Sequence, residues 1–473
     1  MTTDIPESLL MPNEVETRLG TLRFTDGFPD EATAQKVYDQ MDFQRAVEAV
    51  MLTMPGASVH AIRESMRTWG PDNQTACIWA DRMDSKVILL TPNTTVVYLF
   101  MWLDTKGGPL VMETPPNVLG IIDDHWFRYV GDFGNAGPDR GKGGQYLLLP
   151  PGYEGREPSG YRILHSPTFG NWLICRGYLV DGDPGPGTRN IKDHLRVYQL
   201  AQSANPPAMN FVDVSGKAFN TVHAMDQSYF EEINEIVQEE PNEAQVPEVL
   251  GMLDYIGITK GQPFAPDARM KKILTEAAYV AHAASRTILY RNRHKSYAAY
   301  PNSGWETGFP GGSHEFILDG IRKLDQRIRF HFFATGITPA MVIKMVGKGS
   351  QYMMGLRDSE GRALDGGKNY KLHIPPDVPM KDFWDVTIYD VQTRSLLQTD
   401  QRFPGVTSAD KEVVLNPDGS CDIYFGPQRP GGKKVNWLQT VPGKGWHSLF
   451  RLYGPLEPWF DKTWRPGEVE LVD

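Results

Sequence analysis

Hydrophobic residues near the N-terminus recur with the period of an α-helix. Residues 31–67 carry an apolar stripe that the pair Pro55-Gly56 interrupts. Proline lacks a backbone N–H and glycine is flexible, so the pair predicts the end of one helix and a short second helix over 58–68. The pattern therefore predicts an N-terminal helical segment over residues 1–75.

The helical period returns in the middle of the chain, over 190–200 and again over 225–294. Its clearest part follows Asp267, whose carboxylate suits the positive N-terminal end of a helix, and keeps its apolar residues on one face. The longer stretch, 225–294, predicts a helical connector over 216–330.

Two other regions show the pattern of β-strands. From residue 76 to about 180, short apolar runs lie between Pro, Gly, Asn and Asp residues. Beyond residue 330, segments 384–390 and 446–453 alternate apolar and polar residues, as half-buried strands do. We expect a mainly β fold of the α+β class. Two antiparallel β-sandwich or jelly-roll-like domains, 76–215 and 331–473, would be joined by the helical connector.

Composition narrows the possible partners. The formal net charge is −10, and no basic run stands out, which argues against nucleic acid or an anionic membrane surface as a partner. Cys77, Cys175 and Cys421 are far apart and predict neither a disulfide framework nor a thiolate zinc site. The longest strongly apolar run, 96–103, is too short to span a bilayer, and the N-terminus has no signal pattern. These features predict a cytoplasmic protein.

The short motifs of common enzyme classes are incomplete. Ser313 lacks the second glycine of G-x-S-x-G, and the 11 histidines form no HExxH or comparable pair. We therefore expect no cofactor and no metal, and the sequence disfavours a standard hydrolase, kinase or nicotinamide dehydrogenase.

An acidic cluster, Asp123-Asp124-His125-Trp126, is the most site-like group of side chains. It follows an apolar run, so it is expected at the end of a strand. Asp124 could act as a general acid or base, His125 could relay a proton, and Trp126 could pack on a substrate. The alternative is structural, with these residues bonding the amides of a turn.

The glycine-rich loop 131–144 is a second candidate. Glycine lets a backbone approach a ligand closely, and loops on a rigid β scaffold often carry function. Arg140 and Lys142 would steady negative charge, with Asp124 and His125 as their catalytic partners. Ala136 and Gly143 break the phosphate-loop pattern. The alternative is a plain hairpin connection.

Aromatic, amide and basic residues near the C-terminus form a third group. Asn436, Trp437, Lys444 and Trp446 combine flat apolar surface with hydrogen-bond donors, a mixture that suits sugars or polar aromatic ligands, although both tryptophans could instead belong to the core. Arginines in or beside predicted strands could hold a carboxylate or phosphate, or pair with acidic residues: Arg176, Arg394 and Arg451. The further substrate-binding candidates are Asn93, Tyr98, Arg128 and Asp139.

Specific runs of residues point to a family. Four C-terminal segments resemble the bacterial family known as domain of unknown function 1214: Asp418-Gly-Ser-Cys-Asp-Ile-Tyr-Phe-Gly-Pro, Asn436-Trp-Leu-Gln-Thr, Pro442-Gly-Lys-Gly-Trp and Arg451-Leu-Tyr-Gly-Pro. Four upstream features resemble its usual partner, domain of unknown function 1254: Thr91-Pro-Asn, Gly108-Pro-Leu-Val, Gly131 and Leu148-Leu-Pro-Pro-Gly. Relatives tend to carry Asp where this chain has Thr95. The resemblance implies two antiparallel β domains joined by helices and a homo-oligomer, and it implies no established reaction.

Two functions stay open. The first is an enzyme acting on a small polar metabolite, by hydrolysis or isomerisation, with its site at a strand-end mouth or between domains, where pockets usually form. The second is a non-catalytic β-sandwich protein that binds carbohydrate or a partner protein. A deep cleft with convergent charged residues would favour the first, and a shallow aromatic platform the second.

Overall fold

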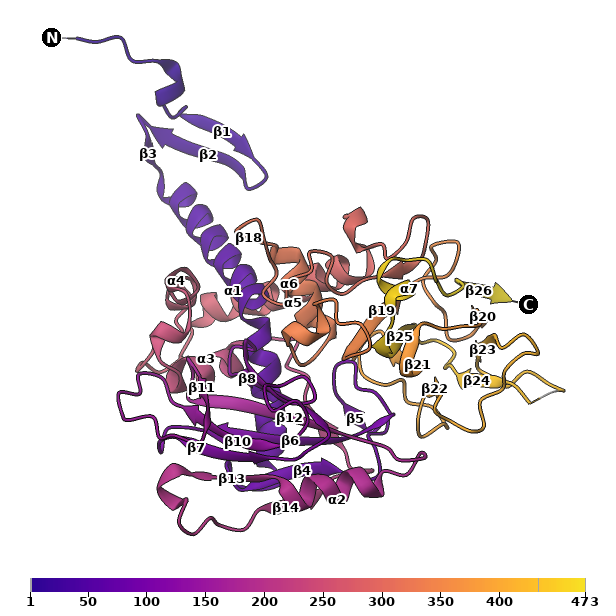
Figure 1. Cartoon of the computed structure of the whole chain (residues 1–473). Coiled ribbons are helices and arrows are strands. Elements are labelled where there is room, and N and C mark those ends of the chain that lie inside the picture. Colours follow the sequence, from indigo (N-terminus) through magenta and orange to yellow (C-terminus); the bar gives the residue numbers. More distant parts are fainter. Residues whose placement is uncertain (1, 433, 473) are drawn as a thin grey trace.

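The N-terminus forms a small β-sheet that stands away from the rest of the molecule. A computed structural model describes residues 2–432 and 434–472. After a turn of 3-10 helix (η1, Glu7–Leu9), strands β1 (Glu14–Thr17), β2 (Gly20–Thr25) and β3 (Phe28–Pro29) pair antiparallel. They project beyond the start of α1 (Figure 1). The hydrophobic pattern predicted no strands in this region, and Leu22 is its only buried apolar residue among those described.

Helix α1 (Glu31–Arg67) runs unbroken through Pro55, so the helix break predicted at Pro55-Gly56 is wrong. Contacts from other elements hold the helix on either side of the Met51 carbonyl, which Pro55 leaves without its helical partner. Carbonyl oxygens in the turn before Pro55 accept hydrogen bonds from side chains elsewhere, that of Val50 from the Tyr229 hydroxyl at 3.0 Å and that of Leu52 from Arg327 Nη1 at 2.9 Å. Tertiary packing therefore overrides the local preference of Pro-Gly.

The N-terminal β domain consists of two packed sheets. The larger has six strands in the order β14 (Asn210–Asp213), β4 (Thr75–Trp79), β6 (Val96–Asp104), β12 (Gly170–Tyr178), β8 (Val118–Asp124) and β9 (Tyr129–Gly134). The smaller has four, β11 (Arg162–His165), β10 (Gly144–Leu149), β7 (Leu110–Thr114) and β13 (Arg196–Gln199). A short pair, β5 (Val87–Ile88) with β15 (Phe219–Asn220), and helix α2 (Gly185–His194) complete the domain.

Both faces of the six-stranded sheet are buried, and strand β6 shows how. Val97, Leu99 and Met101 belong to the core shared with the smaller sheet. Tyr98 and Phe100 point the other way, into a second core shared with α1, with α6 (Leu324–Phe333) and with strands of the C-terminal domain. A strand buried on both faces reads as a continuous apolar run, which is why 96–103 has no polar alternation.

Four further helices lie between the two β domains in sequence. Helices α3 (Tyr229–Glu239), α4 (Pro247–Tyr255) and α5 (Ala268–Tyr290) pack with α1 in one hydrophobic core, and α6 follows. As expected, Asp267 caps α5, its carboxylate accepting a hydrogen bond from Met270 N at 2.7 Å. None of the helices among the described residues is long and apolar enough to cross a membrane.

The C-terminal β domain is also built from two sheets. One has five strands in the order β16 (Trp305–Glu306), β19 (Ser350–Gly355), β25 (Trp446–Pro455), β21 (Met380–Asp390) and β22 (Gly405–Thr407). The other has four, β24 (Asn436–Gln439), β23 (Cys421–Gly426), β20 (Asn369–Ile374) and β26 (Val469–Val472). A hairpin, β17 (Ile317–Leu318) with β18 (Ile321–Arg322), and helix α7 (Glu457–Phe460) lie outside them.

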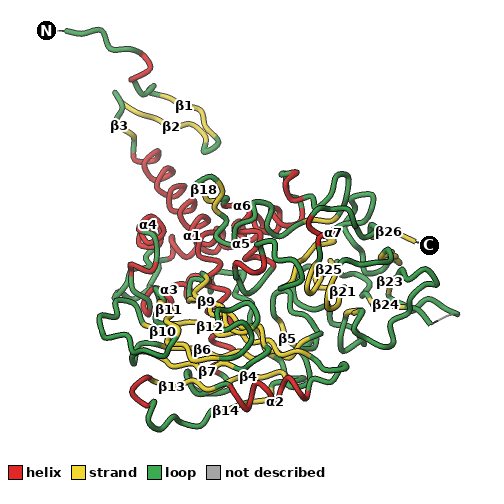
Figure 2. The backbone as a smooth tube through the Cα atoms, viewed as in Figure 1, coloured by secondary structure: helices red, strands yellow, loops and turns green. Residues whose placement is uncertain are grey.

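The predicted fold class is confirmed: a mainly β, α+β fold with two antiparallel β domains and helices between them. Figure 2 shows the strand-rich regions beside the group of helices. A few strand pairs are parallel, including β10 with β11 and β23 with β24. The jelly-roll detail, the exact domain limits 1–75, 76–215, 216–330 and 331–473, and the homo-oligomer stay predictions.

We predict that Gly56→Ala destabilises the protein by about 1–3 kcal/mol, because a methyl group there would lie 2.6 Å from the Trp126 ring. Gly251→Ala, in helix α4, is the matched control. A methyl group there meets nothing within 4 Å, so helix propensity should stabilise the protein by up to about 1 kcal/mol. Urea unfolding measures both, and equal effects would contradict the packing described for α1.

Candidate functional site

The two β domains face each other across one hydrophobic core. The six-stranded sheet contributes Tyr98 and Ile174 to it, and the five-stranded sheet contributes Met354 and Leu449. Each of these sheets uses its other face to pack against its own sandwich partner. The surface between the domains is therefore assembled from the inner strands of both.

A cavity of about 110 Å³ lies within this interface. Since a water molecule needs roughly 10–15 Å³ of such space, the cavity can hold a small organic molecule. Helix α6, the segment 334–342 that follows it and the loop 307–309 close the remaining sides. The apolar wall is formed by Ile121, Ile174, Phe309, Phe330, Phe333, Met354 and Leu449.

The cavity wall contains two arginines. One of them, Arg176 on β12, has no partner among the described residues. Its side chain makes no hydrogen bond or ion pair with any residue that the structure describes, and its Nε atom is buried. Burial opposes the charge, whereas the hydroxyl groups of Tyr352 and Tyr98 raise the pKa of Arg176, so the guanidinium stays charged. An unpaired cation in such surroundings is costly unless an anion joins it.

Arg451, on β25, is the second cation, and both of its Nη atoms donate hydrogen bonds. Its Nη1 donates to Asp385 Oδ1 at 3.0 Å, and its Nη2 donates to the Thr91 carbonyl at 3.0 Å and to the Tyr389 hydroxyl. Both side chains of this ion pair are buried. Arg451 therefore ties the C-terminal sheet to the Thr91-Pro92 turn of the N-terminal domain.

Polar groups from both domains surround Arg176. Asn93 Nδ2 donates to the Tyr453 hydroxyl at 2.7 Å, and Asn93 N donates to the Tyr98 hydroxyl at 3.3 Å. Thr335 Oγ1, also in the wall, is buried without a hydrogen-bond partner among the described residues. Of the residues that the sequence marked as possible ligand-binding groups, the structure brings Asn93, Tyr98, Arg176 and Arg451 into this cavity.

The predicted catalytic cluster, residues 123–126, does not line the cavity. Its side chains contact neighbouring backbone and side chains. Asp124 Oδ1 accepts hydrogen bonds from the backbone of Trp126 and Arg128, and Oδ2 accepts one from Arg128 Nε at 2.7 Å. Trp126 packs on Gly56 of α1. These contacts match the turn-bonding alternative for the cluster, and they give Arg128 a structural partner.

His125 and Asp123 also connect elements. His125 Nδ1 lies 2.8 Å from Glu240 Oε1; burial lowers the pKa of His125 well below its usual value and raises that of Glu240 to about 6. Asp123 Oδ2 accepts a hydrogen bond from Ile337 N at 3.0 Å, and this bond fixes the segment that closes the cavity. Asp123 therefore holds the segment 334–342 of the cavity wall in place.

The glycine-rich loop lies next to the cavity. Asp139 is buried and holds the loop together, accepting hydrogen bonds from Gly134 N, Gly143 N and the Tyr146 hydroxyl. Arg140 is exposed and lines an open groove on the surface, and Lys142 is exposed outside that groove.

The C-terminal candidates lie away from the cavity. Arg394 donates to the carbonyls of Phe332 and Gln392 and stacks over the Phe332 ring. Trp446 is buried in the core of the C-terminal sandwich, and Asn436 bonds backbone atoms of Val414. Trp437 donates to the Gly426 carbonyl, and Lys444 pairs with Asp390. The structure does not assemble them into one surface.

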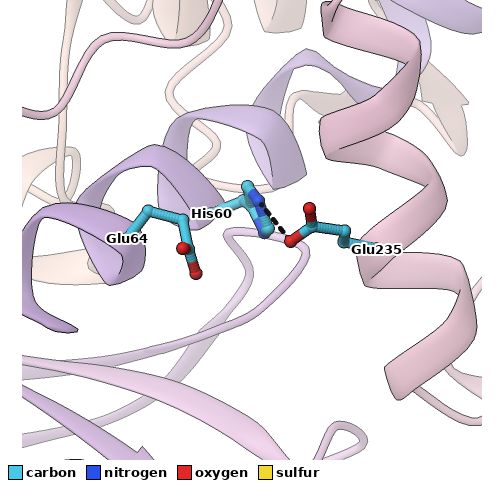
Figure 3. Close-up of side chains that lie close together, drawn as sticks. All are labelled: His60, Glu64 and Glu235. Carbon is cyan, nitrogen blue, oxygen red and sulfur yellow. Dashed lines mark ion pairs between the residues drawn. The ribbon is translucent and has the colours of Figure 1, made fainter.

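One cluster has the geometry of a metal site (Figure 3). His60, Glu64 and Glu235 offer ligand atoms within 4.8 Å of one another, from α1 and α3. Arg63 Nε lies 3.0 Å from Glu64 Oε1, and Arg63 Nη2 lies 3.5 Å from Glu235 Oε2. The guanidinium thus already neutralises the carboxylates that a metal ion would need.

The residues that sequence reasoning missed are those that loops and distant strands bring in, such as Tyr352, Thr335 and Phe333. Arg176 did carry a signal, because a charge within the apolar run 172–179 is unusual. Its lack of a partner depends on the positions of every nearby carboxylate and is visible only in three dimensions.

The fold and the cavity define a two-domain α+β protein with an arginine-lined chamber between its β domains. Residues 74–199 match a family described as "Protein of unknown function (DUF1254)" and residues 349–457 match "Protein of unknown function (DUF1214)". The resemblance to both families that the motifs indicated is confirmed.

Two solved structures are similar to this chain. The VPA0106 protein from Vibrio parahaemolyticus has a TM-score of 0.55 at 16% identity, covering 92% of this chain and 100% of its own. A putative uncharacterized protein from Burkholderia cenocepacia has a TM-score of 0.41 at 14% identity, covering 93% and 97%. The first shares the fold. A comparison with curated proteins finds no match.

We predict that Asp385→Asn destabilises the protein by about 3–5 kcal/mol, because it leaves the Arg451 guanidinium buried without its counter-charge. The matched control is Asp81→Asn, which removes an exposed partner of Arg402 and should cost less than about 1 kcal/mol. Urea unfolding of both variants measures this, and equal small effects would contradict the role given to the buried pair.

His447 makes a pH-dependent contribution to stability. Both ring nitrogens are buried without partners among the described residues, and burial lowers the pKa of His447 to about 3. The stability is fully present above the unfolded pKa of about 6.5 and is lost as the pH falls from there toward 3.

We therefore expect His447→Phe, which keeps a ring beside Tyr389, to gain about 2 kcal/mol relative to the natural protein between pH 7 and pH 5. Urea unfolding at the two pH values measures the difference. His165→Asn, at an exposed position, is the control. A pH-independent difference for His447→Phe would contradict the buried, uncharged state.

Proposed function

We propose that this protein binds a small organic anion in the cavity between its β domains, with Arg176 as the group that holds the negative charge. The observation that carries the proposal is that Arg176 has no partner among the residues that the structure describes. A carboxylate accepts two parallel hydrogen bonds from a guanidinium, and such charge-assisted bonds are about twice as strong as neutral ones.

The rest of the wall suits the rest of such a ligand. Rings of Phe309, Phe330 and Phe333 line the cavity together with Arg176 and the tyrosines Tyr98 and Tyr352. A molecule with a carboxylate at one end and an apolar or aromatic body fits this lining. Ligand sites of this kind are mostly apolar, with a few convergent polar groups that set orientation.

The carbohydrate-binding alternative has less support. A lectin-like platform needs exposed aromatic rings, and Trp446 is in the core. The enzyme reading is compatible with the cavity, because Asp132 lies in a void beside Arg176 and burial raises the pKa of its carboxyl group. We propose binding as the function, in a protein that acts on or carries a small anion in the cytoplasm.

Salicylate tests the proposal, because it is small, anionic and fluorescent, and salicylamide is its neutral analogue. We expect salicylate to bind and salicylamide to bind at least tenfold more weakly. Arg176→Met should weaken salicylate binding by about 1.5–3 kcal/mol, roughly ten- to a hundredfold, the value of hydrogen bonds to a charged group. Isothermal titration calorimetry measures these affinities.

The ligand-free Arg176→Met variant should unfold at a temperature no lower than the natural protein, because it removes a half-buried cation that has no partner among the described residues. Arg429→Met, at an exposed position, is the control and should leave salicylate binding unchanged. Equal affinity for salicylate and salicylamide, or unchanged binding by Arg176→Met, would overturn the proposal.

A further inference from the structure

We propose that the anion reaches the cavity through a passage that opens at a basic groove beside the glycine-rich loop. The inference rests on the proposed function and adds the route and the groups that attract the ligand. Three observations support it. Three neighbouring hollows, running from the cavity to the surface, share lining residues pairwise. Polar atoms along them have no partners among the described residues, and the hollow at the surface is lined by basic side chains.

The middle hollow is a neck of about 20 Å³, roughly the space of one water molecule. It shares four wall residues with the cavity: Ile121, Arg176, Met341 and Tyr352. Arg176 thus faces both spaces, and an anion that passes the neck meets the guanidinium on its way in.

The outer hollow is a surface groove of about 680 Å³. It shares four other residues with the neck: Leu119, Ala136, Ala340 and Gly349. The groove lies between the loop that follows β9, the segment 340–349 and the start of β21. The glycine-rich loop, predicted to face a ligand, would then form one side of the opening.

Polar atoms along the neck have no partners within the described part of the chain. Asp132 Oδ1, Ser350 Oγ and Arg176 Nε are all buried without a hydrogen bond. Buried polar groups are nearly always paired with protein or with ordered water. Three such atoms around one water-sized space indicate a hydrated passage.

The outer groove carries positive charge on an otherwise acidic protein. Arg140, Lys348 and Lys381 are exposed there and form no ion pair among the described residues, and Asp382 is the one carboxylate in the lining. The whole chain has a net charge of −10, so this local excess is unusual. Clefts lined by one sign of charge raise the association rate of oppositely charged ligands.

The neck, at about 20 Å³, is too small to hold an aromatic ring, so its walls must move as a ligand passes. Met341, which lines both the neck and the cavity, is suited to this because its unbranched side chain has three rotatable bonds. Ala340 beside it lines the neck and the groove and does not line the cavity. A bulky residue at 340 should therefore obstruct passage and leave the binding site unaltered.

Stopped-flow fluorescence with salicylate tests the route. We expect Ala340→Trp to slow both association and dissociation at least tenfold while Kd changes less than threefold, the behaviour of an obstructed path. Ala363→Trp, at an exposed position elsewhere, is the control and should leave both rates unchanged. Natural rates in Ala340→Trp, or a weaker Kd with an unchanged association rate, would overturn the route.

A second variant tests the charges without filling the neck. Arg140→Gln with Lys348→Gln and Lys381→Gln should lower the association rate three- to tenfold at low salt, reduce its dependence on salt, and leave dissociation unchanged. Arg429→Gln with Lys411→Gln is the control pair. An association rate equal to that of the natural protein at low salt would overturn the steering role. A natural protein that does not bind salicylate would instead refute the proposed function.

Discussion

No residue that the structure describes forms a hydrogen bond or ion pair with the guanidinium of Arg176, and the interpretation of the site depends on that one imbalance. Two buried arginines have carboxylate partners, Arg451 with Asp385 and Arg63 with three glutamates, whereas the buried Arg394 bonds backbone carbonyls. Arg176 has neither kind of partner among the described residues and faces a cavity, which indicates a place for a missing anion.

The cavity itself follows from how the two β domains are built. Each domain turns one face of its larger sheet toward its own smaller sheet and the other toward the opposite domain. Arg176 and Arg451 lie on inner strands of the two larger sheets, one in each domain. Buried contacts such as Asp123 with Ile337, and Arg451 with Thr91, hold the facing surfaces in register. The site therefore belongs to neither domain alone.

Periodicity predicted the strand-rich regions of both β domains and most helices, because burial on one or both faces leaves a local trace in the order of residues, but it missed the exposed strands β1–β3. It failed at Pro55, where Tyr229 and Arg327 supply hydrogen bonds from far along the chain. It placed Asp124 correctly at a strand end but could not show that both carboxylate oxygens are occupied by the following turn. The sequence marked Arg176 as one of three arginines in or beside strands that could hold an anion, yet pairing is decided by distant residues, which spacing along the chain does not reveal.

A crystal structure of the protein grown with 4-bromobenzoate tests the central claim most directly, because the anomalous signal of bromine locates the ligand without ambiguity. The account predicts a bromine peak among the phenylalanine rings of the cavity and a carboxylate within hydrogen-bond distance of Arg176. Bromine bound only outside the cavity, or a carboxylate directed away from Arg176, would contradict it.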